Sequence, residues 1–379
     1  MYNYQKLILI LLTFFLIVSC KSDYQKPKNI SPKSLVNYAD GFDIISYGSI
    51  HKLIIKKGFQ GDNSKQSFII IPKNITLPDS LKEYTIIRTP IDRIVLTTST
   101  QVTMLQAIDE EKALIGFPNT DYISSKKVRQ MIDSGSVSDI GHEQNINYEK
   151  LFSLNPDVVM GFGVDTSLPH YDKIRSLDIP VIMNSDWLEA HPLGRAEWIK
   201  VFGLLFNKLS QAEIIFNETQ KHYLELKALA KKTTDKPTII CGSVFQDVWY
   251  APSGNSSMAK MIKDANAEYI WEDLKSEGNL ALSIELVIDK GKKANIWLVS
   301  GNYLSLNELK KANKIYPRLT SVQNARVYSY AHLKGDTGGF IYLEESPLHP
   351  DFVLEDLINI FHPEILKKTS NNHYFKALD

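Results

Sequence analysis

A helix followed by a strand is indicated by the stretch YEKLFSLNPDVVMG at residues 148–161. It predicts a short helix over residues 148–154 and, beyond Pro156, a strand over 157–161. Strands and helices are also expected to alternate on both sides of this stretch: strand 93–97, helix 100–108, strand 113–117, helix 170–177 and strand 181–184. Strands separated by single helices of this length indicate βαβ units and a mostly parallel sheet.

A long helical segment follows this first α/β half. Pro192 suits the first position of a helix, and Trp198, Val201, Phe202 and Leu205 give residues 194–206 one apolar face. Ser210-x-x-Glu213 has the form of a capping box, which predicts the start of a second helix running to about residue 231.

Strands and helices alternate again after Pro237. The expected elements are strand 238–242, helix 256–264, helix 283–289, strand 295–299, helix 306–312, strand 326–328 and helix 350–361. The chain is therefore expected to be an α/β protein with two Rossmann-like α/β lobes joined by a long helical linker.

Short strand-like runs precede the first lobe, at residues 42–47, 51–56 and 67–71, and glycines separate them. They predict a small N-terminal β meander. The expected organisation is a signal peptide over 1–19, a lipidated cysteine and linker over 20–40, the meander over 41–85, the N-terminal lobe over 86–191, the linking helices over 192–232 and the C-terminal lobe over 233–379.

The first twenty residues predict export. Lys6 precedes an apolar run over residues 7–18. Because a membrane-spanning helix needs roughly 20 apolar residues, this run fits a signal peptide better. It ends in Ile17-Val18-Ser19-Cys20, which has the form of a lipobox and makes Cys20 the expected lipidation site. The alternative is an ordinary signal peptide with a chance cysteine.

Composition narrows the possible functions. The chain has 43 basic and 43 acidic residues and a formal net charge of zero, so nothing indicates a nucleic-acid surface. The second of its two cysteines, Cys241, follows a β-branched run and is expected to be a buried structural thiol. If Cys20 carries lipid, no disulfide is possible.

Several segments, taken in order, resemble the periplasmic binding proteins for iron-siderophores and vitamin B12, which serve ABC importers. The matching segments include RIVL at 93–96, the 148–159 unit, LDIPVI at 177–182, WYA at 249–251 and LSIEL at 282–286. PLGRAEW at 192–198 and FHPE at 361–364 resemble a lipoprotein branch of the family. The likeness runs from about residue 40 to the C-terminus. The Pro-Asp-Val-Ile expected in the second lobe is replaced by Ala294-Asn295-Ile296-Trp297.

The resemblance implies a docking role for two glutamates. In this family one glutamate per lobe contacts arginines of the permease, and Glu149 and Glu285 occupy the matching positions. Exposed charge pairs are individually weak, but they steer encounter and set register. The alternative is that each glutamate only stabilises the first turn of its helix through the helix dipole.

A ligand is expected between the lobes, near loops that follow the carboxyl ends of the strands. Aromatic walls there would suit a macrocycle or catecholate. The candidate ligand-binding residues are Ser99, Thr100, Phe117, Phe162, Trp187, Trp249, Tyr250, Trp271, Tyr303 and Phe340. Any one ring can instead belong to the core. The segment 335–339, GDTGG, is either a loop closing the cleft or a plain turn.

Enzymatic activity is not expected. The nine histidines form no HExxH or cysteine-paired zinc motif, and no nucleophile elbow or phosphate-binding glycine loop is present. No cofactor or bound metal of the protein itself is therefore predicted. His142 and His170 are either axial ligands of a haem or cobalt centre or solvated loop residues.

The expected function is a periplasmic, lipid-anchored substrate-binding protein of an ABC importer. Its ligand would be a metal chelate, a ferric siderophore first, with cobalamin and haem as alternatives. Its partners would be the permease dimer with its ATPase, and it would contact the membrane through the lipid only. We expect a monomer. The competing hypothesis is an enzyme or surface binding protein that kept the fold without a transport role.

Overall fold

The computed structural model describes residues 32–62, 64–142, 145–163, 169–366 and 371–379. The chain divides into Met1–Pro32 and the compact unit Lys33–Asp379, and the second unit is described here. The predicted signal peptide and Cys20 lie outside the described residues. Within the described ranges, every helix is too short or too polar to cross a bilayer.

The N-terminal segment forms a five-stranded sheet in the order β1-β2-β3-β4-β5. Alternate residues of β2 and β3 are buried, among them Phe42, Ile44, Leu53 and Ile55, which gives the sheet one apolar face. The strands are β1 (Lys33–Ser34), β2 (Phe42–Tyr47), β3 (Ile50–Ile55), β4 (Gln66–Pro72) and β5 (Thr85–Thr89). The antiparallel meander is confirmed, and β5, which pairs parallel with β4, continues the sheet past residue 85.

The N-terminal lobe contains a parallel sheet in the order β12-β11-β6-β7-β8. Four of its five strands are completely buried because helices cover the sheet, which explains their continuous apolar sequences. The strands are β6 (Ile94–Leu96), β7 (Leu114–Phe117), β8 (Ser138–Asp139), β11 (Val158–Gly161) and β12 (Val181–Met183). The helices are α2 (Ser99–Ala107), α3 (Lys126–Asp133), α4 (Tyr148–Ser153) and α5 (Pro169–Arg175). Helix α3 and strand β8 have no counterpart among the predicted elements.

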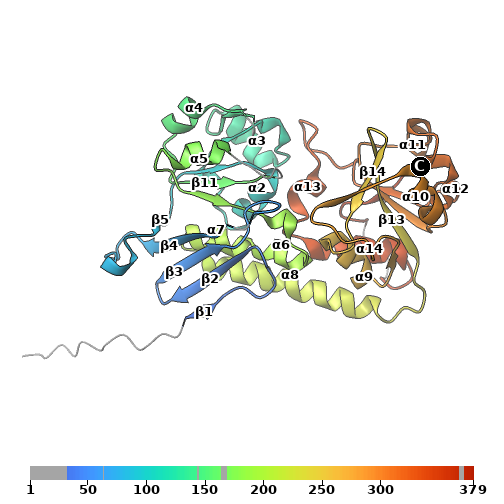
Figure 1. Cartoon of the computed structure of the whole chain (residues 1–379), viewed down its shortest axis with the longest axis horizontal. Coiled ribbons are helices and arrows are strands. Elements are labelled where there is room, and N and C mark those ends of the chain that lie inside the picture. Colours follow the sequence, from blue (N-terminus) through green and yellow to red (C-terminus); the bar gives the residue numbers. More distant parts are fainter. Residues whose placement is uncertain (1–31, 63, 143–144, 164–168, 367–370) are drawn as a thin grey trace, which may run out of the picture. The chain divides into compact units, whose positions relative to one another are not determined.

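Three consecutive helices, α6 (Pro192–Glu197), α7 (Ile199–Leu205) and α8 (Leu209–Ala230), link the lobes. Figure 1 shows α8 passing from the N-terminal lobe to the C-terminal lobe. Pro192 opens α6 as predicted. The predicted capping box at Ser210 is wrong: Asn207 has a φ of 57°, which ends α7, so Lys208 is the N-cap of α8 and Ser210 already lies in its first turn.

The C-terminal lobe has a seven-stranded mixed sheet around β13 (Thr238–Phe245). Gln246 and Asp247 both have positive φ, and they form a tight turn into the antiparallel strand β14. This hairpin was not predicted. The other strands are β14 (Val248–Pro252), β15 (Glu268–Tyr269), β16 (Asn279–Leu282), β17 (Ile296–Val299), β18 (Val327–Ser329) and β19 (Lys376–Ala377).

Four helices of the C-terminal lobe match predicted helices, whereas those over residues 320–323 and 341–345 were not predicted. The helices are α9 (Ser257–Asp264), α10 (Ile284–Leu286) with a π-helical turn (Val287–Gly291), α11 (Leu306–Ala312), α12 (Thr320–Gln323), α13 (Ile341–Glu345) and α14 (Pro350–Phe361). Helix α14 packs on the linking helix α8, whereas α13 packs on α2 of the N-terminal lobe. The predicted fold, two α/β lobes with a helical link and an N-terminal β meander, is confirmed.

Candidate functional site

Glu149 and Glu285 occupy equivalent places in the two lobes. Each is exposed in the first turn of a short helix, α4 or α10, that precedes a buried strand (Figure 1). Each follows its N-cap residue by two positions: the Asn147 side chain accepts from the Lys150 N–H at 2.9 Å, and the Ser283 hydroxyl accepts from the Leu286 N–H at 3.3 Å. Neither glutamate forms an ion pair with any described residue. Their carboxylates are thus available to a partner.

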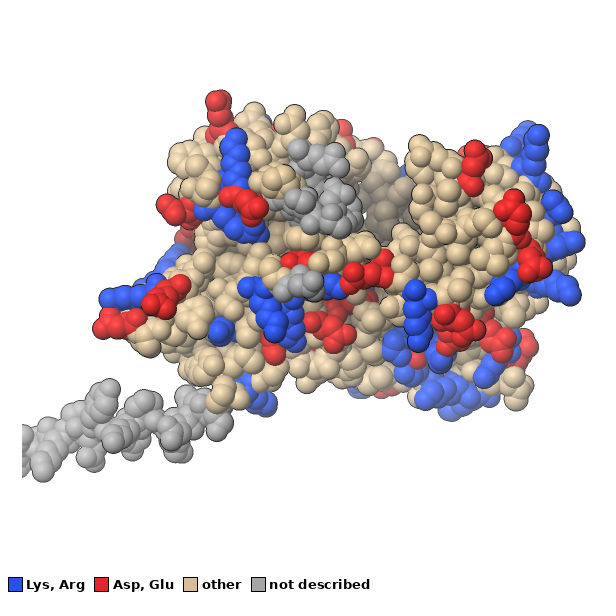
Figure 2. Space-filling view, in the orientation of Figure 1, with Lys and Arg blue, Asp and Glu red and all other residues tan. Residues whose placement is uncertain are grey.

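Four of the predicted ligand-binding residues, Ser99, Phe117, Phe162 and Phe340, line one cavity of about 580 Å³ between the lobes. We call it the aromatic cavity. Its N-terminal wall comes from residues that end or follow strands β6, β7 and β11, and its C-terminal wall comes from residues 337–343. Figure 2 shows a hollow between the lobes whose visible walls are mostly uncharged. This is where a parallel sheet is expected to present its ligand.

A loop from the C-terminal lobe closes one side of the aromatic cavity. The Thr337 hydroxyl donates to the Asp121 carbonyl oxygen at 2.8 Å. A Cβ on Gly339 would lie 2.6 Å from the Tyr122 carbonyl oxygen, so only glycine fits this close approach. Of the two readings of segment 335–339, the structure therefore favours the loop that closes the cleft.

Glu344, in helix α13 directly after this loop, binds the N-terminal lobe and so fixes the end of the loop. Its carboxylate accepts hydrogen bonds from the backbone N–H groups of Ser124 at 2.7 Å and Ser125 at 3.0 Å, at the start of helix α3. Burial raises the pKa of Glu344 to about 7 despite these bonds, because the carboxylate is removed from water.

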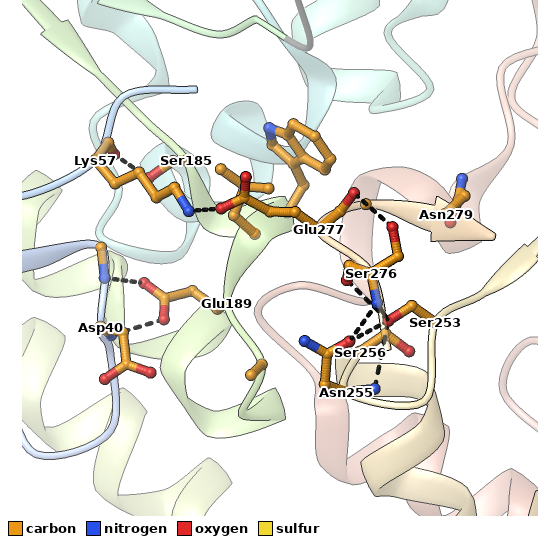
Figure 3. A pocket seen from close by; sticks show the side chains of 15 residues that line it. Asp40, Lys57, Ser185, Glu189, Ser253, Asn255, Ser256, Ser276, Glu277 and Asn279 are labelled. Atoms are coloured by element: carbon orange, nitrogen blue, oxygen red, sulfur yellow. Dashed lines mark hydrogen bonds and ion pairs between the residues drawn. The ribbon is translucent and has the colours of Figure 1, made fainter. Parts of the chain in front are cut away.

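A second, more hydrophilic cavity of about 300 Å³ lies where the N-terminal sheet and both lobes meet (Figure 3). We call it the polar cavity. Its lining consists of Asp40, Gly41, Lys57, Ser185, Trp187, Leu188, Glu189, Ala190, Ser253, Asn255, Ser256, Ser276, Glu277, Gly278 and Asn279. The Trp187 ring of this cavity lies 6.4 Å from the Phe162 ring of the aromatic cavity, centroid to centroid.

The N-terminal sheet contributes directly to the polar cavity. Lys57, just after β3, forms an ion pair with Glu277 of the C-terminal lobe, and the Gln60 amide donates to the Glu277 carbonyl oxygen at 2.9 Å. The Ser185 hydroxyl donates to the Lys57 carbonyl oxygen at 2.6 Å. Sequence reasoning missed Lys57 and Glu277, because neither belongs to a motif and they are far apart in the chain.

Glu189 links the cavity wall to the N-terminal segment. Its carboxylate accepts from the backbone N–H groups of Asp40 at 2.7 Å and Gly41 at 2.9 Å, and from the Trp198 indole at 3.0 Å. Burial raises its pKa to about 7. The side chain is therefore a partly ionised acceptor near neutral pH.

Two predicted ligand contacts need correction. Trp249 and Trp271 are completely buried in the C-terminal lobe and line neither cavity. Along β14, Trp249 points into the core, where its indole donates to the Cys241 carbonyl oxygen at 2.9 Å, and neighbouring Tyr250 points to solvent. Alternation along a strand separates these two rings.

The remaining candidates lie elsewhere. Tyr250 is exposed beside Phe245, and Tyr303 packs edge-on against Tyr316; neither lines the aromatic or the polar cavity. Thr100 lies in the first turn of α2, and its buried hydroxyl has no hydrogen-bond partner among the described residues. Cys241 is buried as predicted, which raises the pKa of its thiol.

Neither His142 nor His170 belongs to a cluster of metal-ligating side chains among the described residues. His142 is exposed in a short strand, and the His170 ring lies 4.1 Å from Tyr171. Throughout the part of the chain that the structure describes, no three His, Cys, Asp or Glu side chains are placed to hold a metal ion.

Two α/β lobes, a helical link and cavities between the lobes define a solute-binding protein of the two-lobe type. Residues 94–332 match the family model described as periplasmic binding protein, and the chain belongs to this family. The match confirms the family resemblance drawn from the sequence. It does not extend to the N-terminal sheet.

Relatives agree with this assignment. An uncharacterized lipoprotein of Methanocaldococcus jannaschii is 26% identical over 92% of this chain and 86% of its own length. A periplasmic heme binding protein of Pseudomonas aeruginosa has a TM-score of 0.57 at 17% identity, covering 76% of this chain and 98% of that chain. An ABC-type Fe³⁺-hydroxamate transport protein of Saccharomonospora viridis has a TM-score of 0.54 at 16% identity, covering 72% of this chain and 94% of that chain.

Proposed function

We propose that this chain is the lipid-anchored substrate-binding protein of an ABC importer. It captures a metal chelate, a ferric siderophore, between its lobes, and delivers it to the permease dimer with its ATPase. Cys20 carries the lipid that holds the protein at the membrane on the periplasmic side. The protein binds its ligand without transforming it.

The aromatic cavity is the observation that carries this proposal. Phe162 and Phe340 are half-buried, come from opposite lobes and line the same space. A cavity of about 580 Å³ falls within the range typical of small-molecule sites. Rings offer a flat chelate a large contact area, and they lose little conformational freedom on binding. Cobalamin and haem suit such walls as well and are the alternative ligands.

Delivery would use Glu149 and Glu285. Each carboxylate is exposed at the same helical position in its lobe, so the pair can contact two arginines of a two-fold symmetric permease. Such contacts orient the binding protein on the permease and speed its association, but they add little affinity. A transient complex requires this combination.

A direct ligand screen tests the proposal. The full-length chain, purified in detergent, is titrated with ferric hydroxamates, cobalamin and haem, and binding is followed by tryptophan quenching and by calorimetry. We expect saturable one-to-one binding of at least one chelate. If none of the three classes bound while the protein stayed folded by circular dichroism, the proposal would be wrong.

A further inference from the structure

Charged side chains are distributed unevenly around the two cavities. The polar cavity has the carboxylates of Asp40, Glu189 and Glu277, and the aromatic cavity has that of Asp121. Lys57 is the one lysine or arginine that lines either cavity within the described residues. Four carboxyl groups, of which Glu189 is partly protonated near neutral pH, thus face a single ammonium group.

That ammonium group is already engaged. Lys57 and Glu277 form an ion pair across the polar cavity, so their charges largely cancel (Figure 3). Asp40 is exposed and forms no ion pair with a described residue. Asp121 lies 3.9 Å from Arg129, but its side chain is 75% exposed, so this pair is weak. The remaining charge of the cavities is negative.

Two other cations lie near the cavities without lining them. Arg195 donates to the fully buried Asp186 at 3.3 Å. Lys334 donates to the Asn302 amide oxygen at 2.6 Å, and its ammonium lies 5.2 Å from the centre of the Phe340 ring. The Arg195 charge is offset by Asp186, but the Asn302 amide is neutral, so Lys334 keeps its positive charge beside the aromatic cavity, which has one carboxylate. The excess of carboxylates therefore lies at the polar cavity.

We infer that the cleft selects metal chelates whose outer surface is neutral or positively charged, and that it disfavours anionic catecholate, citrate or propionate-bearing ligands. This inference rests on the function proposed above and narrows its ligand class. A cleft with low-dielectric walls focuses its field, so a small excess of carboxylates acts strongly on an entering ion.

The two cavities would hold different parts of such a ligand. The flat or apolar part lies against Phe162 and Phe340, and a hydroxyl or ammonium group reaches the polar cavity. There Asp40 offers a free acceptor. The exposed Asn255 amide offers its NH2 group as a donor, because its oxygen already accepts from the Ser253 hydroxyl and the Ser276 backbone N–H. The 6.4 Å separation of the Phe162 and Trp187 rings places the two regions within reach of one ligand.

A series of ferric trihydroxamates that differ only in tail charge tests this inference. Ferrioxamine B carries a free ammonium, its N-acetyl derivative is uncharged, and its N-succinyl derivative carries a carboxylate. The full-length chain is titrated with each at pH 8, where Glu189 is ionised. Affinity should fall in that order, by about threefold to tenfold between successive members.

Substitutions show which side chains cause the preference for the ammonium form. Asp40→Asn and Glu277→Gln should each reduce the preference for the ammonium form over the succinyl form by about threefold, and Lys57→Met should increase it. Glu268→Gln, an exposed glutamate of the same lobe that lines neither cavity, is the matched control and should leave the preference unchanged.

The outcomes separate the two proposals. Equal affinities across the series, tighter binding of the succinyl form, or variants that change nothing would overturn the charge inference while leaving chelate binding intact. Failure of every chelate, cobalamin and haem included, would overturn the proposed function and this inference with it.

Discussion

The carboxylate of Glu344 in the C-terminal lobe accepts a hydrogen bond from the backbone N–H of Ser124 in the N-terminal lobe at 2.7 Å. This bond joins the lobes beside the aromatic cavity, which the neighbouring residues Tyr122 and Leu343 line. Because Glu344 is almost completely buried, its ionisation is coupled to folding.

The contribution of Glu344 to stability should therefore decrease as the pH rises through its pKa, whereas His191, whose pKa burial lowers from 6.5 to about 4, acts in the opposite direction between those values. Burial raises the pKa of Glu344 from 4.5 to about 7, so this group binds more protons in the folded chain than in the unfolded chain between these values. Its contribution is fully present below pH 4.5 and is lost as the pH approaches 7 and beyond. Glu344→Gln should weaken this dependence, as measured by urea unfolding at pH 5, 6, 7 and 8.

The matched control for that series is Glu285→Gln, at an exposed site. It should leave the pH profile as in the unaltered chain. Glu189 and Asp356, whose pKa values burial raises to about 7 and about 6, contribute in the same direction, so part of the slope should persist in Glu344→Gln. A slope identical to that of the unaltered chain would contradict the role of Glu344.

Ligand affinity should depend on the half-buried rings of the aromatic cavity. Phe162→Ala and Phe340→Ala each remove an aromatic surface from one wall, and each should weaken chelate binding by about tenfold or more. Phe245→Ala, which removes an exposed ring on the β13–β14 hairpin, should change affinity by less than about twofold. Calorimetry with the bound chelate measures all three. Comparable losses for Phe245→Ala and the cavity variants would argue against this binding site.

Docking should fail when the two exposed glutamates are reversed in charge. Glu149→Lys combined with Glu285→Lys should reduce uptake by at least about tenfold, because like charges would meet at the permease. Ligand affinity should stay within about threefold. Uptake is measured with a radiolabelled chelate in cells that carry the importer.

A second double variant controls for the change in net charge. Glu218 on α8 and Glu268 on β15 are also exposed, and replacing both with lysine changes the total charge by the same amount. Uptake should be preserved in this control. If both double variants transport equally well, Glu149 and Glu285 are not the docking residues.

The N-terminal segment should depend on a buried ion pair for its position. Glu197 is fully buried, pairs with Lys200 at 2.7 Å and accepts backbone N–H groups from Tyr38 at 2.7 Å and Ala39 at 3.0 Å. Glu197→Ala should reduce the free energy of unfolding by about 3–5 kcal/mol, since it leaves Lys200 and these donors unpaired in the core.

Chemical denaturation measures that loss, and Glu213→Ala on α8, outside this network, should cost less than about 0.5 kcal/mol. Removing Lys200 together with Glu197, as Lys200→Met and Glu197→Leu, should restore part of the stability because no lone buried charge remains. Equal losses in the single and double variants would exclude an unpaired charge as the cause.

Local sequence determined the alternation of strands and helices, the two lobes and their helical link. Strands such as Ile94–Leu96 and helices such as Leu306–Ala312 are specified by short patterns of apolar residues, which act between neighbours in the chain. The equivalent positions of Glu149 and Glu285 could be predicted from the sequence for the same reason. Each follows a local cap and precedes a strand.

Tertiary structure alone decided which residues meet at the cleft. Lys57 and Glu277 are 220 positions apart, as are Ser124 and Glu344, and no local pattern relates such pairs. The tryptophans also differ in their surroundings: Trp187 lines a cavity, whereas Trp249 is buried in the core of its lobe. An aromatic residue in sequence is equally suited to core and cleft, because both remove its ring from water, and only the packing of the lobes distinguishes the two.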